Sequence, residues 1–309
     1  MEAKTILLTG GLGYVGGRLS KYFADQGHKV IALSRNKTVD YPNIQVNSNT
    51  DVLKAGLLDD HKVDVLIHLA SPNEIEFEKN PDHCKEVHQK GTIEWLEWAK
   101  SKTVGQFIYF STVHVYARPL VGEFNENSLC NPQHPYSISH KNVEEHVLNY
   151  QKDHELNVKV VRLSNSFGFP AFPTSNRWTL FINDLCKQAV ETAKIEIRSN
   201  PLQQRDFISL SNVCTAVESI IQSKGKDSPI YNLSSGHSTT LLEMAERIKS
   251  IAEKKLGKEI PLIFDKQKMQ ESGEVEISNE KLRSIGWELD QVHFEMEIEK
   301  TVEFLVKST

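Results

Sequence analysis

The sequence contains no hydrophobic run of the length that crosses a membrane, and its first residues lack the charged and then apolar pattern of a secretory signal. It has only four cysteines, far apart and without a C-x-x-C pair, which argues against a redox dithiol and indicates free thiols in a reducing cytoplasm. Its twelve histidines form no H-E-x-x-H or similar ligand set, so we predict no metal. The net charge of −5 argues against a nucleic-acid partner. We therefore expect a cytoplasmic protein with neither a membrane nor a nucleic-acid partner.

What is present is an alternation of short apolar runs with helical patterns. Strands are expected at 5–8, 28–35, 44–46, 63–69, 105–110 and 158–163, and helices at 81–100 and 136–151. This alternation predicts an α/β fold with a doubly wound parallel sheet, a Rossmann fold. The 309 residues suffice for one large α/β unit or for two lobes that share a core.

The pattern changes after Asn165, where glycine and proline interrupt regular structure. We expect residues 1–164 to form a dinucleotide-binding Rossmann domain, with 207–235 returning to it. The segment 205–208 and the apolar helix after Asn212 are expected to rejoin the main sheet, which gains another strand at 229–233. Residues 165–206 and 236–309 are expected to form a smaller C-terminal substrate lobe with helices at 241–251 and 294–305.

Three glycines follow the first expected strand. Gly10, Gly13 and Gly16 stand three apart, and a helical pattern begins among them. Glycine permits a tight turn and the close approach of a ligand, and the positive N-terminal end of the next helix attracts a pyrophosphate. The stretch predicts a dinucleotide site, and the alternative is a plain strand-to-helix turn.

The second expected strand ends in Ser34-Arg35. An acidic residue at this place would accept hydrogen bonds from the adenosine ribose of NAD. A hydroxyl and a guanidinium suit a 2′-phosphate instead. We therefore favour NADP(H) over NAD(H), which stays possible, and the alternative is that Arg35 is an ordinary surface residue.

Further short motifs follow in a fixed order along nearly the whole chain. They are Thr9-Gly10-x-x-Gly13-x-x-Gly16, 64–70 (DVLIHLA), Gly91-Thr92, Ser111-Thr112 ahead of Val115-Tyr116, Tyr136, Arg162-x-x-Asn165-x-x-Gly168, Arg205-Asp206-Phe207, Tyr231-Asn232-Leu233 and Leu282-x-x-Ile285-Gly286-Trp287. In this order they resemble the extended short-chain dehydrogenase/reductase family, in its nucleotide-sugar epimerase, dehydratase and reductase branch. The resemblance implies cofactor contacts from Gly10, Gly13, Tyr14, Val15, Ser34, Arg35, Leu69, Ala70, Ser71, Ser111, Tyr136 and His140.

The resemblance also implies the catalytic residues. In this family a tyrosine exchanges a proton with the sugar oxygen while hydride moves to or from the nicotinamide, and an upstream serine or threonine holds the same oxygen. Tyr136 and Thr112 occupy these places, with Ser111 as a neighbour. A carbonyl that gains hydride develops negative charge, which a nearby acid must neutralise. The alternative for Tyr136 is a packing role at a helix start.

The chain departs from the family pattern Tyr-x-x-x-Lys, whose lysine holds the nicotinamide ribose and lowers the pKa of the tyrosine. Here the fourth residue after Tyr136 is His140, and Lys141 comes one position late, on another side of the helix. Either His140 takes over the ribose contact, or local helix distortion turns Lys141 inward. A histidine with an ordinary pKa near ~6.5 supports a tyrosinate less than a lysine does.

Other positions narrow the substrate. Sugar 4,6-dehydratases of this family carry Thr-Asp-Glu where this chain has Thr112-Val113-His114, so dehydration is not expected. Arg205 matches the arginine that holds the nucleotide diphosphate, and its planar fork suits phosphate oxygens. The alternative is a surface pair with Asp206. The resemblance also implies substrate contacts from Thr112, Asn165, Arg177 and Trp178.

These observations favour an NADP-dependent reductase that acts on the 4-keto group of a nucleotide-activated deoxysugar. An epimerase of the same substrate class, with a retained nicotinamide, is the first alternative. A non-catalytic NADP-binding sensor or scaffold is the second, and the absence of the family lysine is its only support. The resemblance further implies a homodimer, in which the helices at 81–100 and 136–151 form a four-helix bundle.

Overall fold

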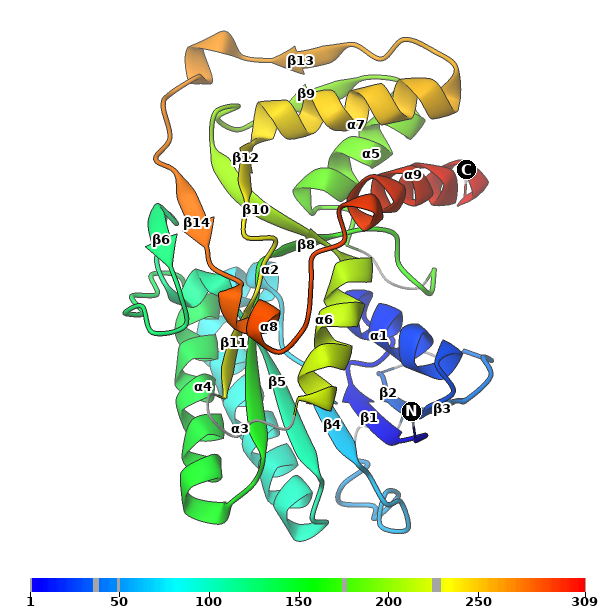
Figure 1. Ribbon diagram of the computed structural model, residues 1–309, viewed down its shortest axis with the longest axis vertical. Helices are drawn as coiled ribbons and strands as arrows, with labels where there is room; N and C mark the ends of the chain where they lie inside the picture. Colours follow the sequence, from blue (N-terminus) through cyan, green and yellow to red (C-terminus); the bar gives the residue numbers. More distant parts are fainter. Residues whose placement is uncertain (1, 36–38, 49–50, 174–176, 224–228, 309) are drawn as a thin grey trace.

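The computed structural model describes residues 2–308 apart from 36–38, 49–50, 174–176 and 224–228. Its largest element is a sheet of seven parallel strands (Figure 1). In spatial order the strands are β11 Ile230–Leu233, β7 Val158–Leu163, β5 Gln106–Thr112, β4 Val65–His68, β1 Thr5–Thr9, β2 Lys29–Leu33 and β3 Ile44–Asn47. The strands β4 and β5 are buried along their whole length, and β1, β2, β7 and β11 at all but one end residue, as the continuous apolar runs predict. The expected doubly wound parallel sheet is confirmed.

Helices cover both faces of this sheet. On one face, α3 (Pro81–Ser101) and α4 (Pro135–His154) pack on apolar side chains of β2, β4, β5 and β7. On the other face, α1 (Tyr14–Asp25) and α6 (Leu210–Gln222) pack on β1, β4, β5, β7 and β11. The two layers and the sheet between them are visible in Figure 1.

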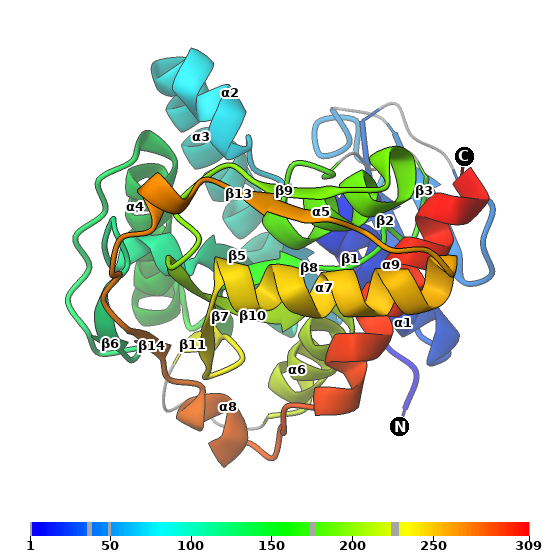
Figure 2. The same cartoon turned by 90° about the horizontal axis from the view of Figure 1, so that it is seen from above.

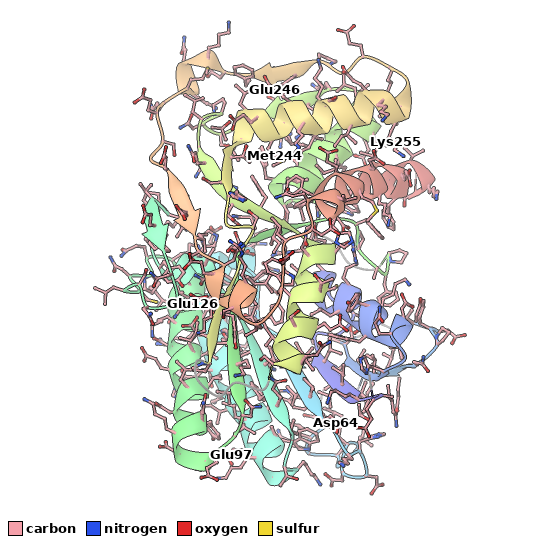
Figure 3. All side chains as sticks on the ribbon, in the orientation of Figure 1. Asp64, Glu97, Glu126, Met244, Glu246 and Lys255 are labelled. Carbon is pink, nitrogen blue, oxygen red and sulfur yellow. The ribbon has the colours of Figure 1, made fainter. Side chains whose placement is uncertain are left out.

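A smaller lobe sits beyond the carboxyl ends of these strands (Figures 1 and 2). Its core joins α5 (Phe181–Thr192), α7 (Leu241–Leu256) and α9 (Gln291–Ser308). Thr240 and Glu243 form a capping box at the start of α7, and Gly257 ends this helix with φ of 64°. Met244 of α7 is buried among residues of α5 and α9 (Figure 3).

Short strands connect the lobe to the main sheet. The strands β8 Asn165–Phe167, β10 Gln204–Ser209 and β12 Ser238–Thr240 form a three-stranded sheet, and the pairs are β9 Ile195–Ile197 with β13 Leu262–Phe264 and β6 Gly122–Phe124 with β14 Val275–Ile277. The remaining elements are α2 Glu74–Lys79, α8 Glu280–Ser284 and the 3₁₀ turns η1 Val113–Val115 and η2 Lys266–Lys268. The expectation that 205–208 rejoins the main sheet is wrong, because β10 pairs with β8 and β12. The following helix α6 and strand β11 do lie with the main sheet.

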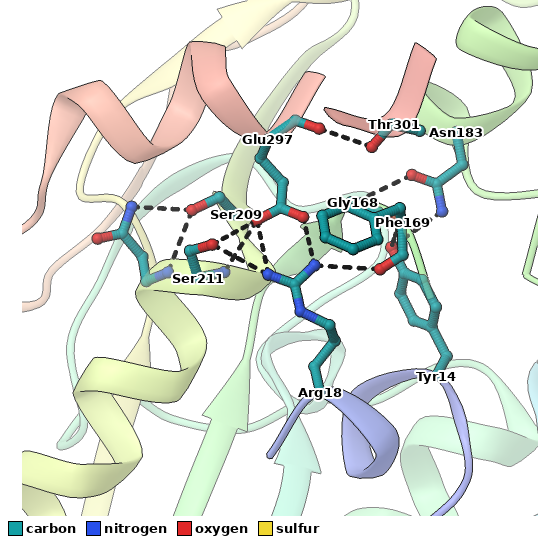
Figure 4. A network of polar contacts seen from close by, with 10 residues as sticks. Tyr14, Arg18, Gly168, Phe169, Asn183, Ser209, Ser211, Glu297 and Thr301 are labelled. Atoms are coloured by element: carbon teal, nitrogen blue, oxygen red, sulfur yellow. Dashed lines mark hydrogen bonds and ion pairs between the residues drawn. The ribbon is translucent and has the colours of Figure 1, made fainter. Parts of the chain in front are cut away.

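A buried ion pair links the lobe to the first helix of the main sheet. Arg18 of α1 binds the carboxylate of Glu297 in α9, and both side chains contact Ser211 of α6 (Figure 4). The lobe and the main sheet are thus joined by charged contacts as well as by apolar packing. No helix among the described residues is long and apolar enough to span a membrane.

Candidate functional site

The carboxyl ends of neighbouring parallel strands bring the predicted cofactor residues to one edge of the main sheet. Thr9 ends β1 and pairs in register with Leu33 of β2 on one side and His68 of β4 on the other. Tyr109 of β5 lies beside His68 in turn. Segments that follow these strands emerge together, which is the usual ligand position in open α/β sheets.

The glycine turn between β1 and α1 is tightly closed. Gly10 has φ of 68°, and its carbonyl oxygen accepts a hydrogen bond from the N–H of Gly13 at 2.8 Å. A β-carbon on Gly16 would stand 2.2 Å from that oxygen, so the turn would have to shift. Gly13 gives α1 no side-chain cap, and no acidic residue lies in its first turn. The first N–H groups of α1 are therefore suited to an anion such as a pyrophosphate.

The next two predicted residues, Tyr14 and Val15, face away from this anion position. The hydroxyl of Tyr14 donates to the carbonyl oxygen of Gly168 and accepts from Nδ2 of Asn183, both at 2.9 Å. Val15 packs against the core on the α1 and α6 side of the sheet. A cofactor contact from either residue would therefore use its backbone.

The end of β2 lies directly beside the glycine turn. The N–H of Gly11 donates to the carbonyl oxygen of Leu33 at 3.0 Å. Ser34 follows, and its N–H donates to the carbonyl oxygen of Asn47 at 3.1 Å, while Arg35 is exposed. Ser34 and Arg35 thus follow directly after Leu33, the residue that binds the glycine turn.

The end of β4 closes the other side of the turn. The hydroxyl of Thr9 accepts hydrogen bonds from the N–H groups of Leu69 and Ala70 at 3.2 and 3.1 Å. The hydroxyl of Ser71 donates to the carbonyl oxygen of Pro72 at 3.0 Å and lies 3.4 Å from Nε2 of a histidine in α4. Leu69 and Ala70 therefore lie against the glycine turn, and Ser71 follows them toward α4.

That histidine is His140, and it lies against Tyr136. The two ring centroids are 4.4 Å apart, in an edge-to-face arrangement. Burial lowers the pKa of His140 well below its usual range, and the neighbouring His88 and His68 lower it further. Lys141 instead pairs with Glu145 at 2.8 Å on the outside of the helix. Lys141 is therefore not turned inward, and His140 is the residue beside Tyr136; the contact of His140 with the ribose stays a prediction.

Two hydroxyls end strand β5. Ser111 and Thr112 are both buried, and Thr112 accepts a hydrogen bond from the N–H of His114 at 3.3 Å. The hydroxyl of Ser111 is buried without a hydrogen-bond partner among the described residues. Because buried polar atoms are rarely left unpaired, Ser111 is suited to a ligand group.

Charged residues from two segments surround Tyr136. Glu74, at the start of α2, pairs at 3.2 Å with Arg177, which precedes α5. Burial, and then the negative charge of Glu74, raise the pKa of Tyr136, while the positive charge of Arg177 acts in the opposite direction. The phenol therefore keeps its proton at neutral pH.

The residues that replace the dehydratase acids differ from each other in environment. Val113 is fully buried in an apolar cluster with Tyr116. His114 is exposed as a residue. Desolvation of its imidazole, and then the positive charge of Arg205, lower its pKa to about 4. Neither side chain is a carboxylate, and the expectation that this chain is not a dehydratase stays a prediction.

The other predicted substrate residues have partners within the protein. Asn165 donates from Nδ2 to the carbonyl oxygen of Asp206 at 2.8 Å, and Arg205 donates to Oε1 of Gln203 at 3.0 Å. Trp178 stacks on Phe304 of α9, with ring centroids 5.9 Å apart. The positive charge of Arg205 acts on His114, which follows β5, and lowers its pKa. Trp178, by contrast, packs in the smaller lobe.

The sequence reasoning assigned no role to His88, Tyr109 and Glu74. His88 and Thr92 are buried on α3 together with Cys84 and Leu96. Cys84, His88, Thr92 and Leu96 follow one another at intervals of four residues, which is the signal that they share one face of α3. Because His88 and Thr92 are polar, this face does not form a continuous apolar stripe in the sequence.

This arrangement fits a dinucleotide cofactor. The uncapped start of α1 suits its pyrophosphate, and a β-carbon at Gly16 would collide with the turn that leads there. The unpaired hydroxyl of Ser111 and the ring of His140 lie farther along the same edge. Among the residues placed in the structure, no group of three or more histidine, cysteine or acidic side chains could hold a metal ion.

Comparison with known proteins agrees with the fold and the motifs. The chain is 26% identical to a dTDP-D-glucose 4,6-dehydratase of Dictyostelium discoideum, over 80% of this chain and 62% of that protein. It is 26% identical to a putative UDP-glucose 4-epimerase of Methanocaldococcus jannaschii, over 91% of this chain and 92% of that protein. A UDP-N-acetylglucosamine 4-epimerase structure from Methanobrevibacter ruminantium has a TM-score of 0.82 and 19% identity, covering 100% of both chains.

A family model confirms the resemblance that the motifs indicate. The match runs from residue 6 to residue 234, and thus includes the glycine turn, Tyr136 and β11. The chain belongs to the NAD dependent epimerase/dehydratase family, whose members are extended short-chain dehydrogenase/reductase enzymes.

Proposed function

We propose that this enzyme acts on a nucleotide-activated sugar and reduces the 4-keto group of a deoxysugar. The observation that carries the proposal is the contact between Tyr136 and a neutral His140. A phenol that keeps its proton is the form that donates to a carbonyl oxygen. The opposite reaction, oxidation of a hydroxyl, needs a tyrosinate, which a neutral histidine supports poorly.

The roles of the side chains follow from this direction. A reduced nicotinamide, when bound, supplies the hydride that reduces the keto carbon. Tyr136 donates its phenolic proton to the carbonyl oxygen as that oxygen gains negative charge, so that the product is a secondary alcohol. Thr112 donates a hydrogen bond to the same oxygen, and Ser111 supplies a second hydroxyl beside it. His140 binds a ribose hydroxyl of the cofactor.

We propose NADP(H) as the cofactor. Ser34 and Arg35 stand beside the glycine turn, where a hydroxyl and a guanidinium would bind a 2′-phosphate. Titration with NADPH and NADH tests this choice, and tighter binding of NADH would remove it. The diphosphate of the substrate is assigned to Arg205, with further contacts from Asn165, Arg177 and Trp178.

An epimerase is the second candidate, because the Methanocaldococcus jannaschii relative and the Methanobrevibacter ruminantium structure carry that name. The two functions differ in the fate of the cofactor. A reductase consumes NADPH in proportion to a nucleotide-linked 4-keto-6-deoxysugar and releases NADP. An epimerase interconverts the 4-hydroxyl epimers without net consumption. Binding of NADPH with no turnover of either substrate class would favour the remaining alternative, a non-catalytic NADP-binding sensor or scaffold.

We also propose a homodimer built from α3 and α4, which pack side by side. Both helices expose apolar side chains: Val87 is 47% exposed and Ile138 is 38% exposed. A second copy of the pair would cover them in a four-helix bundle. A monomeric mass in analytical ultracentrifugation would contradict this proposal. Two further expectations remain predictions. One is the division into a dinucleotide-binding domain (1–164 with 207–235) and a substrate lobe (165–206 with 236–309), and the other is the cytoplasmic location.

A further inference from the structure

Behind Tyr136, a chain of buried polar side chains crosses three elements and ends at Ser71. Ser139 Oγ lies 2.9 Å from Nδ1 of His88, whose Nε2 lies 3.1 Å from the hydroxyl of Tyr109. The same hydroxyl lies 2.7 Å from Nδ1 of His140, whose Nε2 lies 3.4 Å from Ser71 Oγ. Ser139, His88, Tyr109 and His140 are all buried. Nothing in the proposed mechanism accounts for the first three.

The direction of every hydrogen bond in this chain follows from its last member. Ser71 donates its only hydroxyl proton to the carbonyl oxygen of Pro72, which can only accept. Ser71 Oγ therefore accepts from His140, and the proton of this neutral imidazole is on Nε2. Nδ1 of His140 then accepts from Tyr109. In the reverse orientation Ser71 would have to abandon Pro72, which leaves that bond unmade.

The remaining directions are then determined as well. Tyr109 has one proton and gives it to His140, so its oxygen accepts from Nε2–H of His88. Nδ1 of His88 accepts from the hydroxyl of Ser139. Each donor along this chain of hydrogen bonds thus has an acceptor. A charged imidazolium at His140 would place its Nδ1–H against the hydroxyl proton of Tyr109, so this arrangement disfavours the charged form.

A parallel chain fixes a third histidine in the same form. The hydroxyl of Thr9 accepts from two backbone N–H groups, so it donates to Nδ1 of His68 at 2.8 Å. Nε2–H of His68 donates to Thr92 Oγ1 at 3.1 Å, and Thr92 donates to the carbonyl oxygen of His88 at 2.8 Å. This chain does not involve Tyr109, and it joins the first one only through the backbone of His88.

We propose that Tyr109 and His88 are positioning residues, which hold His140 neutral and present its Nε2–H at the cofactor edge. In the absence of a ligand this Nε2–H donates to Ser71 Oγ, and when a cofactor binds it exchanges that acceptor for a hydroxyl of the bound molecule, so that His140 serves as an uncharged hydrogen-bond donor. This role rests on the proposed function, whereas the position of the proton does not. It explains how the helix supplies a donor beside Tyr136 without a positive charge that would favour the tyrosinate.

The proton positions are tested directly by ¹⁵N nuclear magnetic resonance of the histidine rings. In the wild-type protein His68, His88 and His140 should all give the Nε2–H signature. The substitution Tyr109→Phe removes the donor to Nδ1 of His140 and the acceptor of Nε2–H of His88, so the ¹⁵N shifts of these two nitrogens should change while the signature of His68 stays. His88→Gln keeps an amide donor near Tyr109 and should leave His140 in its wild-type form. An Nδ1–H signature at His140 in the wild type, or an unchanged ¹⁵N shift of His140 Nδ1 in Tyr109→Phe, would overturn the proposal.

The functional readout uses cofactor binding and turnover. Tyr109→Phe should raise the KM for NADPH about tenfold, the loss expected for one misdirected hydrogen bond, and change kcat much less. Tyr150→Phe, on the part of α4 beyond His140, is the matched control and should change neither KM nor kcat. Expected histidine signatures together with no NADPH binding would refute the proposed function and leave the proton assignment standing. Equal KM values for Tyr109→Phe and wild type would refute the positioning role.

Discussion

Tyr136 and His140 are one helical turn apart on α4, and their rings are in contact. A lysine at the second position would bring a positive charge and stabilise a tyrosinate. His140 is buried and neutral, and Glu74 adds a negative charge on the other side. Burial and then the charge of Glu74 raise the pKa of the phenol, which therefore keeps its proton at neutral pH, as the proposed reduction requires.

Removal of that proton donor is the first prediction. Tyr136→Phe keeps the ring that packs on Phe77 and His140 but removes the hydroxyl. We expect kcat for sugar reduction to fall about 10²–10⁴-fold, the usual contribution of a positioned acid, with little change in NADPH affinity. Steady-state kinetics and fluorescence titration measure the two. Tyr150→Phe serves as the control, and a Tyr136→Phe enzyme that turns over normally would exclude the assigned donor.

A second residue-scale prediction concerns the glycine turn. The β-carbon of Gly16→Ala would stand 2.2 Å from the carbonyl oxygen of Gly10, so backbone atoms that face the pyrophosphate must move. We expect the Kd for NADPH to rise by at least about tenfold, a cost near 1.4 kcal/mol.

Gly91→Ala on α3 is the matched control for this experiment. No atom lies within 4 Å of a β-carbon built at Gly91. Alanine in a helix is favoured over glycine by about 0.8–1.0 kcal/mol, so this variant should be slightly more stable and bind NADPH normally. Equal Kd values for the two variants would show that the turn does not hold the cofactor.

At the scale of whole elements, α9 is held to α1 by the ion pair of Arg18 and Glu297. The guanidinium also donates to the carbonyl oxygen of Phe169 at 3.1 Å and to Ser211 at 3.0 Å, and it lies 4.4 Å from the centre of the Phe169 ring (Figure 4). Glu297 is almost completely buried. Removing one charge from such a pair leaves the other without compensation.

We therefore expect Glu297→Gln to lower the free energy of unfolding by about 3–5 kcal/mol. Glu295→Gln, on the same helix, breaks an exposed pair with Arg247 and should cost about 0–1 kcal/mol. Urea denaturation of both variants measures the difference. Equal losses would mean that the buried pair contributes no more to stability than a surface one.

Long, locally encoded elements could be predicted from the sequence, and those that depend on distant partners could not. The strand, glycine turn and helix at the N-terminus are one contiguous pattern, and α3 and α4 match their expected ranges within a few residues. The segment 205–208 reads as an apolar strand, but its partner β8 lies about forty positions earlier, and nothing local distinguishes it from a strand of the main sheet.

The candidate site shows the same limit. Tyr136, Thr112 and His140 are predicted because the resemblance to the family, carried by contiguous motifs, implies their roles. His88 and Tyr109 come from α3 and β5, and only the folded chain brings them to His140. Buried polar residues on a helix weaken its apolar stripe, so the side chains that build a hydrogen-bonded interior are those that a hydrophobic pattern conceals.

For the molecule as a whole, the buried side chains of His68 and His88 make the free energy of unfolding depend on pH. Burial lowers the pKa of His68 to about 3 and that of His88 to about 4, whereas an unfolded chain has values near ~6.5. Between about pH 6.5 and pH 4 the unfolded chain therefore binds more protons than the native one. The free energy of unfolding should fall with falling pH across this window, by up to about 1.4 kcal/mol per pH unit for each buried histidine.

The contribution of one histidine is isolated by a difference between variants. His68→Asn removes a group that takes up a proton only on unfolding, so its free energy of unfolding should fall less steeply from pH 6.5 to pH 4.5 than that of the wild type. His83→Asn removes an exposed histidine of α3 and should leave the slope unchanged. Urea denaturation at several pH values gives the slopes. Parallel curves for wild type and His68→Asn would mean that His68 is already charged in the native protein, which the hydrogen bond from Thr9 to its Nδ1 does not allow.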